Sequence, residues 1–153
     1  MKATGIVRRI DDLGRVVIPK EIRRNLHIRE GDPLEIYIED GGVMFKKYSL
    51  MSTISSFASQ VQIAFNSNGI SAAIFDNSNI LSGTARSFGI STVPDEWIDI
   101  RHPATKWENM FVTPILLDGE QAGFICYRNN NDEETIHDTV KFAAKLLANM
   151  LAY

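Results

Sequence analysis

The chain has 153 residues, of which 44% are hydrophobic and 23% charged, and this composition is typical of one or two folded domains and argues against disorder. A single cysteine, Cys126, excludes an intramolecular disulfide and a cysteine-rich zinc site and favours a reducing compartment. No apolar run approaches the roughly 18 residues of a membrane span, and no secretory signal opens the chain, so we expect a cytoplasmic protein without a membrane partner.

The net charge of -3 hides an uneven distribution of charge along the chain. Residues 1–48 carry ten Lys and Arg against eight Asp and Glu, whereas residues 49–153 carry six against eleven. Within residues 1–30 there are eight basic residues and four acidic ones. A basic excess at one end is what a nucleic-acid-binding surface needs, although a solvated face can show it too.

The first 48 residues alternate short apolar segments with turn residues. Pro19 suits the start of a helix because its missing N–H is not needed there, and the segment Asp40-Gly41-Gly42 signals a hairpin. The predicted elements are strands at Gly5–Ile10, Arg15–Ile18, Leu34–Glu39 and Val43–Lys47 and a helix at Lys20–Leu26. The sequence therefore predicts two hairpins joined by a short helix.

A segment of this size is too small to be stable alone. About 48 residues bury too little apolar surface to offset the conformational entropy lost on folding. We therefore expect the segment to dimerise. A two-fold dimer would also double its arginine-bearing loops and space them for two contacts on a DNA duplex.

Four runs of residues in this segment carry a family resemblance, the most specific part being the spacing Asp-x-x-Gly-Arg-x-x-Ile-Pro. The runs are Thr4–Asp11, Leu13–Pro19, Glu21–Arg24 and Gly31–Glu35. They resemble the AbrB family of bacterial transition-state regulators, and within it the SpoVT (stage V sporulation protein T) branch. The resemblance covers residues 1–48, about a third of the chain, and implies a swapped-hairpin β-barrel dimer in which two chains interleave their strands.

The resemblance also implies a set of residues that contact double-stranded DNA: Arg8, Arg15, Arg23 and Arg24, with Lys2 and Arg9 as weaker candidates. The chemistry agrees, because a guanidinium group binds phosphate through two parallel hydrogen bonds and can reach guanine edges. The alternative is that these arginines form ion pairs with nearby carboxylates on a solvated surface. The family further implies degenerate, AT-leaning DNA sites.

After residue 48 we expect a linker over 49–55 and a second domain over 56–153. Apolar spacing predicts an amphipathic helix at 54–64 and a closing helix from Glu133. The predicted strands lie at Ile70–Phe75, Ile80–Leu81, Met110–Leu117 and Ala122–Tyr127. Residues 82–107 show no periodicity and are expected to be loop-rich, with one or two short helices.

The two predicted helices carry apolar stripes with the spacing of helices that pack on other helices. We expect them to pack within the chain and across a subunit interface, and the residues predicted for oligomerisation are Ile54, Phe57, Val61, Val140 and Leu147. The element order resembles a GAF-like α/β sensor domain, as in SpoVT-type regulators, although about 100 residues is short for one. Small-molecule sensing and a purely structural role both stay open.

The chain shows no signature of catalysis or of a bound cofactor. Its three histidines, His27, His102 and His137, lack the spacing of metal sites, and nucleophile-elbow, phosphate-loop and dinucleotide motifs are missing. We predict a non-enzyme without metal or cofactor: an α+β DNA-binding transcription regulator of transition-state or sporulation genes, forming a dimer and then a tetramer. The alternatives are an antitoxin of the MazE type and a metabolite-binding oligomeric scaffold without DNA binding.

Overall fold

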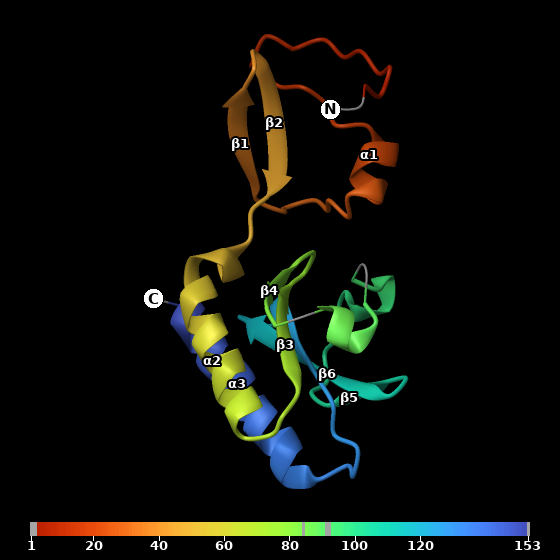
Figure 1. Cartoon of the computed structure of the whole chain (residues 1–153). Coiled ribbons are helices and arrows are strands. Elements are labelled where there is room, and N and C mark those ends of the chain that lie inside the picture. The colour runs from red at the N-terminus through yellow and green to blue at the C-terminus, as the bar shows by residue number, and fades with distance from the viewer. Residues whose placement is uncertain (1–2, 84, 91–92, 153) are drawn as a thin grey trace. The chain divides into compact units, whose positions relative to one another are not determined.

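The computed structural model describes residues 3–83, 85–90 and 93–152. The chain divides after Tyr48 into two compact units, which we call the N-terminal unit and the C-terminal unit (Figure 1). Both sheets are antiparallel, and helices and strands are segregated along the chain, so the α+β class predicted from the sequence is confirmed. Within the described residues, no helix is long and apolar enough to cross a membrane.

The N-terminal unit contains one short helix and one hairpin. Helix α1 spans Lys20–Asn25 and follows Pro19, as predicted. Strands β1 (Leu34–Glu39) and β2 (Gly42–Lys47) pair in register across a two-residue turn. The turn residues Asp40 and Gly41 have φ values of 49° and 73°, which matches the hairpin turn whose twist suits the flanking strands.

The strands predicted at Gly5–Ile10 and Arg15–Ile18 are absent from the single chain. Both segments are irregular, and a turn between them is closed by hydrogen bonds from Asp11 N to Arg15 O (3.0 Å) and from Gly14 N to Asp11 O (3.1 Å). A strand needs a neighbour to supply its ladder of hydrogen bonds. In the described part of the chain, no other segment lies alongside these two as a third or fourth strand.

The N-terminal unit has no core of its own. None of its described residues is buried, and Val7 and Ile38 are 84% and 86% exposed. The exposed large apolar side chains of this unit are Ile6, Val7, Ile10, Leu13, Val16, Val17, Leu26, Ile36, Tyr37, Ile38, Val43, Phe45 and Tyr48. Apolar burial is the main force that stabilises a fold, and this unit gains little of it as a single chain.

The C-terminal unit is built on a five-stranded antiparallel sheet with the order β4-β3-β7-β6-β5. The strands are β3 (Ala72–Asp76), β4 (Ile80–Ser82), β5 (Thr105–Trp107), β6 (Met110–Leu117) and β7 (Glu120–Tyr127). Four of them were predicted to within a few residues. Strand β5 was missed because it has only three residues and its apolar pattern is too short to show a period.

Two helices cover one face of this sheet, α2 (Ser55–Ser67) and α3 (Glu134–Leu151) (Figure 1). They share an apolar core with the strand residues that point toward them, such as Ile74 and Ile125. Alternate residues of the same strands, including Phe75 and Phe124, point to the opposite face. The sheet is therefore buried on both sides.

The second face is covered by the irregular segment between β4 and β5, which contains the short 3₁₀-helices Ala85–Phe88 and Asp95–Trp97. Its anchor is Trp97, which makes edge-to-face contacts with Phe124 (5.2 Å between ring centroids) and Phe75 (6.3 Å). Phe75 and Phe124 stack on each other at 5.0 Å. Aromatic packing therefore organises residues 82–107. Such packing has no fixed sequence period, which is why the sequence predicted no regular structure there.

Residues 49–55, predicted to be a linker, belong instead to the C-terminal unit. Leu50–Ile54 form a 3₁₀-helix that runs directly into α2. Met51 is fully buried, and Ile54 lies in the same core. Buried apolar side chains fix this segment to the sheet, whereas a linker would leave them in solvent.

The predicted oligomerisation residues lie inside the C-terminal unit. Ile54, Val140 and Leu147 are buried in its core, and Phe57 and Val61 pack against that core. Helical spacing identifies an apolar stripe but not what covers it, and here the sheet covers it. The large apolar side chains that α2 and α3 leave exposed are different ones, namely Ile63, Phe142 and Met150.

This distinction yields a stability prediction for α3. Leu147→Ala should lower the free energy of unfolding of the C-terminal unit by about 2–5 kcal/mol, because it opens a cavity in a fully packed core. Phe142→Ala on the same helix should change it by no more than about 0.5 kcal/mol, since Phe142 is 68% exposed in the single chain. Chemical denaturation followed by far-UV circular dichroism measures both, and equal losses would contradict this assignment of the two faces.

Candidate nucleic-acid interface

The turn between the two irregular N-terminal segments is organised by the side chain of Asp11. Its Oδ1 accepts hydrogen bonds from the backbone N–H groups of Leu13 (3.0 Å) and Arg15 (2.8 Å), and its Oδ2 accepts one from Nε of Arg15 (2.8 Å). Hydrogen bonds from the backbone and side chain of Arg15 lower the pKa of this carboxyl group. Gly14 closes the turn with a φ of 73°, a conformation that suits glycine.

Helix α1 presents two arginines from its last turn, Arg23 and Arg24. Nε of Arg23 donates a hydrogen bond to the carbonyl of Ile18 (3.2 Å), which anchors the side chain while it stays exposed. Nη1 of Arg8 donates to the carbonyl of the preceding residue, Val7 (3.2 Å). Both contacts go to neutral backbone oxygens, so the positive charges are not neutralised by them.

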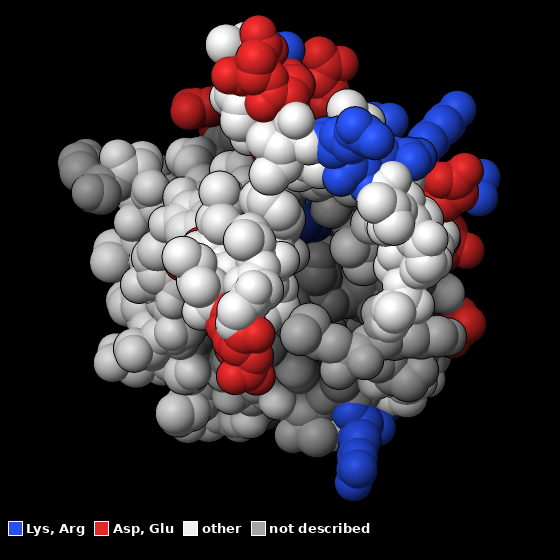
Figure 2. Space-filling view, turned by 90° about the horizontal axis from the view of Figure 1, so that it is seen from above, with Lys and Arg blue, Asp and Glu red and all other residues white. Residues whose placement is uncertain are grey.

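The candidate arginines are thus exposed on one small unit. Arg8, Arg9, Arg15, Arg23 and Arg24 all lie on its surface, whereas Lys2 falls outside the described residues. Of the five, Arg15 alone forms an ion pair with a described residue. On the face drawn in Figure 2, Lys and Arg side chains gather in one group, and acidic side chains lie both beside it and in a second group.

Some basic residues of the unit serve its structure instead. Nζ of Lys47 lies 3.2 Å from Oδ2 of Asp32 and donates to the carbonyl of His27 (2.8 Å). Asp32 also accepts the backbone N–H of Arg29 (2.8 Å). These bonds tie β2 to the connection between α1 and β1. The ammonium group of Lys47 is therefore engaged by Asp32 and His27 within the unit, and Lys47 is not a candidate for DNA contact.

The C-terminal unit contains a cavity of about 150 Å³ on the sheet face opposite α2 and α3. Its lining residues are Phe88, Gly89, Ile90, Pro94, Trp97, Trp107, Glu108 and Met110. The indole Nε1 atoms of Trp97 and Trp107 are buried and have no hydrogen-bond partner among the described residues. Buried N–H donors usually have an acceptor, so these two distinguish the cavity from ordinary apolar packing.

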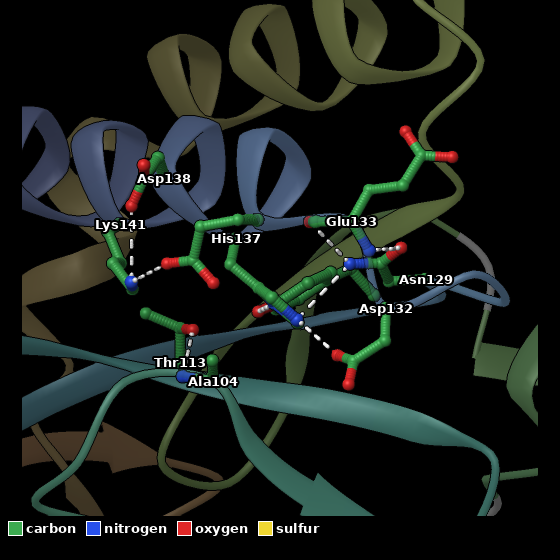
Figure 3. Close-up of polar contacts among 10 residues, drawn as sticks. Ala104, Thr113, Asn129, Asp132, Glu133, His137, Asp138 and Lys141 are labelled. Carbon is green, nitrogen blue, oxygen red and sulfur yellow. Dashed lines mark hydrogen bonds and ion pairs between the residues drawn. The ribbon is translucent and has the colours of Figure 1, made fainter.

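A polar network around the buried side chain of His137 joins the end of β7 to the start of α3 (Figure 3). Nε2 of His137 lies 2.7 Å from Oδ1 of Asp132, and Nδ1 lies 2.8 Å from the hydroxyl of Tyr127. A carboxylate only accepts hydrogen bonds, so Nε2 of His137 is the donor in the contact with Asp132. Burial raises the pKa of Tyr127. Since both imidazole nitrogens are engaged, the network serves to hold α3 on the sheet.

The described residues offer neither a reactive thiol nor a cluster of metal ligands. Cys126 is buried on β7, where burial raises the pKa of its thiol to about 12, so the nucleophilic thiolate is not formed near neutral pH. Across the described parts of the chain, no three His, Cys, Asp or Glu side chains come together as metal ligands. The exposed arginines and the cavity are therefore the two features that invite a functional explanation.

Comparison with known proteins first defines the class of the N-terminal unit. Residues 7–49 match the family model described as antidote-toxin recognition MazE, bacterial antitoxin. The transition state regulatory protein AbrB of Bacillus subtilis (strain 168) is 62% identical over 48 residues, 31% of this chain and 50% of that protein. The solution structure of the N-domain of the transcription factor abrB covers 31% of this chain and 92% of that one, with a TM-score of 0.30.

A second relative extends the similarity to the whole chain. Stage V sporulation protein T of Bacillus subtilis (strain 168) is 39% identical over 176 residues, which covers 99% of each chain. The chain therefore belongs to the AbrB/SpoVT family of bacterial transition-state regulators, and the resemblance found in the sequence is confirmed. Because the alignment is longer than the 153 residues of the chain, it contains gaps in this chain.

Proposed function

We propose that this chain is a DNA-binding transcription regulator that contacts duplex DNA through Arg8, Arg15, Arg23 and Arg24, with Arg9 and Lys2 in supporting roles. The observation that carries the proposal is a unit in which all five described candidate arginines are exposed and whose sequence is 62% identical to AbrB over 48 residues. A solved structure with the same identity is described as the N-terminal DNA recognition domain of AbrB. Sporulation is the expected setting, as the name of the full-length relative indicates.

The DNA-binding state is a swapped-hairpin dimer. In the single N-terminal unit, the irregular segments Gly5–Ile10 and Arg15–Ile18 have no strand partner among the described residues, and most large apolar side chains lie in solvent. A second copy supplies both missing elements at once, because an isologous two-fold interface offers each segment its counterpart. The exposed apolar side chains then form a shared barrel core, and the arginine-bearing loops are doubled.

The C-terminal unit links such dimers into a tetramer and carries a GAF-like fold. Ile63, Phe142 and Met150 are apolar and exposed on its two helices, on the side away from the sheet that covers the buried stripe. Apolar side chains exposed on a folded surface can form the apolar core of a subunit interface. We therefore propose these three residues for the subunit contact, in place of the oligomerisation residues predicted from the sequence.

The alternative of a MazE-type antitoxin accounts for the N-terminal unit only. The matched model ends at residue 49, whereas the C-terminal unit has a fully packed sheet with cores on both faces. An antitoxin's poorly structured tail would not need such cores. A scaffold that does not bind DNA would leave the exposed arginines without a role, so the regulator is the better account.

The cavity of the C-terminal unit is the place for a small-molecule effector. Its volume of about 150 Å³ matches cavities that take up a benzene-sized molecule. The two tryptophans that line the cavity have indole N–H groups without a partner among the described residues, so a ligand with a hydrogen-bond acceptor would suit them, and the apolar lining favours a compact apolar body. A small carbonyl compound meets both requirements.

The dimer is tested by placing a charge in its shared core. Ile38→Asp should reduce the mass of the assembly and abolish DNA binding, because a carboxylate would be buried without a partner. Ile38→Val keeps the apolar surface and should preserve both properties. Light scattering after size-exclusion chromatography measures the mass. If the single chain were the working state, Ile38→Asp would leave the mass unchanged, since Ile38 is 86% exposed there.

DNA binding is tested by its dependence on salt. The affinity of the full chain for an AT-rich duplex should fall steeply with ionic strength, because binding releases counterions from each neutralised phosphate. Arg8→Ala, Arg23→Ala or Arg24→Ala should each weaken binding by about 10- to 100-fold and make the slope shallower. Fluorescence anisotropy with labelled duplexes gives affinity and slope together.

The matched control for these arginines is Arg86→Ala, which removes one exposed positive charge from the C-terminal unit. It should leave affinity and slope close to those of the unaltered chain. Salt-independent binding, or equal losses for Arg86→Ala and the N-terminal variants, would show that the N-terminal arginines are not the DNA contact.

The effector cavity is tested by intrinsic fluorescence, since both tryptophans of the chain line it. Isobutyramide, a compact amide, should shift the tryptophan emission in a saturable way, whereas cyclopentane, which has no acceptor, should bind more weakly. Trp107→Phe should weaken isobutyramide binding by about 3- to 10-fold, the worth of one hydrogen bond. An emission spectrum that no small amide changes would refute an effector role for this cavity.

A further inference from the structure

The Asp11 carboxylate occupies an unexpected place for a DNA-binding surface. It lies in the turn that carries Arg15 and contacts Nε of that arginine at 2.8 Å. A carboxylate repels the phosphates that the arginine is proposed to bind. Seen from a more distant phosphate, the Asp11–Arg15 pair also has no net charge, so its long-range attraction is lost. If charge alone governed binding, Asp11 would weaken it. The contacts of Asp11 suggest a different contribution.

Asp11 fixes the backbone and the side chain of Arg15 at the same time. One oxygen accepts the N–H groups of Leu13 and Arg15, and the other accepts Nε of Arg15. Because the guanidinium group is planar and rigid, a bond at Nε sets the direction of its two terminal amines. The Arg15 side chain nevertheless remains 71% exposed, so it is oriented without being covered.

Orientation before binding has a defined energetic value. A long, flexible side chain loses rotamer entropy when it is immobilised at an interface. A side chain already held in place loses less on binding. Among the described candidate arginines, Arg15 alone is held by a carboxylate. Nε of Arg23 is held by the neutral carbonyl of Ile18, so the charged acceptor is what distinguishes Arg15.

We propose that Asp11 is a positioning residue for DNA recognition, which orients the terminal amines of Arg15 toward one duplex site and so favours specific over non-specific binding. The proposal rests on the DNA-binding function proposed above. It predicts that removing the negative charge of Asp11 weakens specific binding, which is the opposite of the effect that simple electrostatics gives. The sign of the effect therefore decides between the two explanations.

The test substitutions are Asp11→Asn and, as a matched control, Asp12→Asn. Asn at position 11 keeps an oxygen for the backbone N–H groups but presents an amide N–H₂ to Nε of Arg15, which it cannot accept. Asp12 is exposed and makes no side-chain hydrogen bond to a described residue, so its substitution removes the same charge and nothing else. Asp11→Ser, whose hydroxyl supports the turn but is too short to reach the guanidinium group, provides a second variant.

The probes are a duplex enriched by the unaltered full chain from a random library and a scrambled duplex of the same base composition. Asp11→Asn and Asp11→Ser should weaken binding to the enriched duplex by about 3- to 10-fold for each loop engaged, and should leave or strengthen binding to the scrambled one. Asp12→Asn should strengthen both slightly and equally. Circular dichroism and the mass of the assembly verify that each variant is folded.

A double-mutant cycle identifies the partner of Asp11. In an Arg15→Ala background, Asp11→Asn should have the same small effect as Asp12→Asn, because the residue to be oriented is gone. A loss that persists in that background, or equal effects of Asp11→Asn and Asp12→Asn in the unaltered background, would overturn the proposal. If the unaltered chain enriches no duplex from the library, the DNA-binding function itself fails. That outcome is distinguishable from a failure of the positioning role of Asp11.

Discussion

The shortage of apolar burial in the N-terminal unit is the constraint on which the rest of the molecule depends. Its described residues include none that is buried, although the segment is rich in Val, Ile and Leu. A chain of this size cannot form a sufficient core from its own residues. In the dimer proposed above, a second copy supplies the core, and the same two-fold operation doubles the arginine-bearing loops. Under that proposal, stability and DNA recognition have one physical origin.

The elements whose patterns are local were predictable from the sequence. Helices α1, α2 and α3 and strands β1, β2, β6 and β7 follow apolar periodicity and turn chemistry, and they begin and end near the predicted residues. The segments Gly5–Ile10 and Arg15–Ile18 show the limit of that approach. Their apolar pattern is that of strands, but a strand forms only beside a neighbouring strand. The described residues of one chain do not supply such a neighbour.

Other features depend on tertiary contacts that leave no local pattern. The stripe that includes Val140 and Leu147 was predicted to be buried, but its spacing is the same whether a sheet or another subunit covers it. Trp97 and Trp107 lie in a segment without periodicity, and their shared cavity arises from packing across the sheet. Asp11 is part of the recognised motif, yet only its three hydrogen bonds reveal that it holds Arg15.

Charge alone gives this protein little attraction for DNA. The excess of basic over acidic residues in positions 1–48 is only two, and the whole chain is negative. Long-range attraction scales with such totals and is weakened further by physiological salt. In the proposed complex, affinity therefore comes from guanidinium groups held in defined positions and from several loops acting on one duplex, where linked contacts raise the effective concentration of each other. The same two requirements account, under the proposals above, for the carboxylate beside Arg15 and for the folded C-terminal unit that accompanies so small a module.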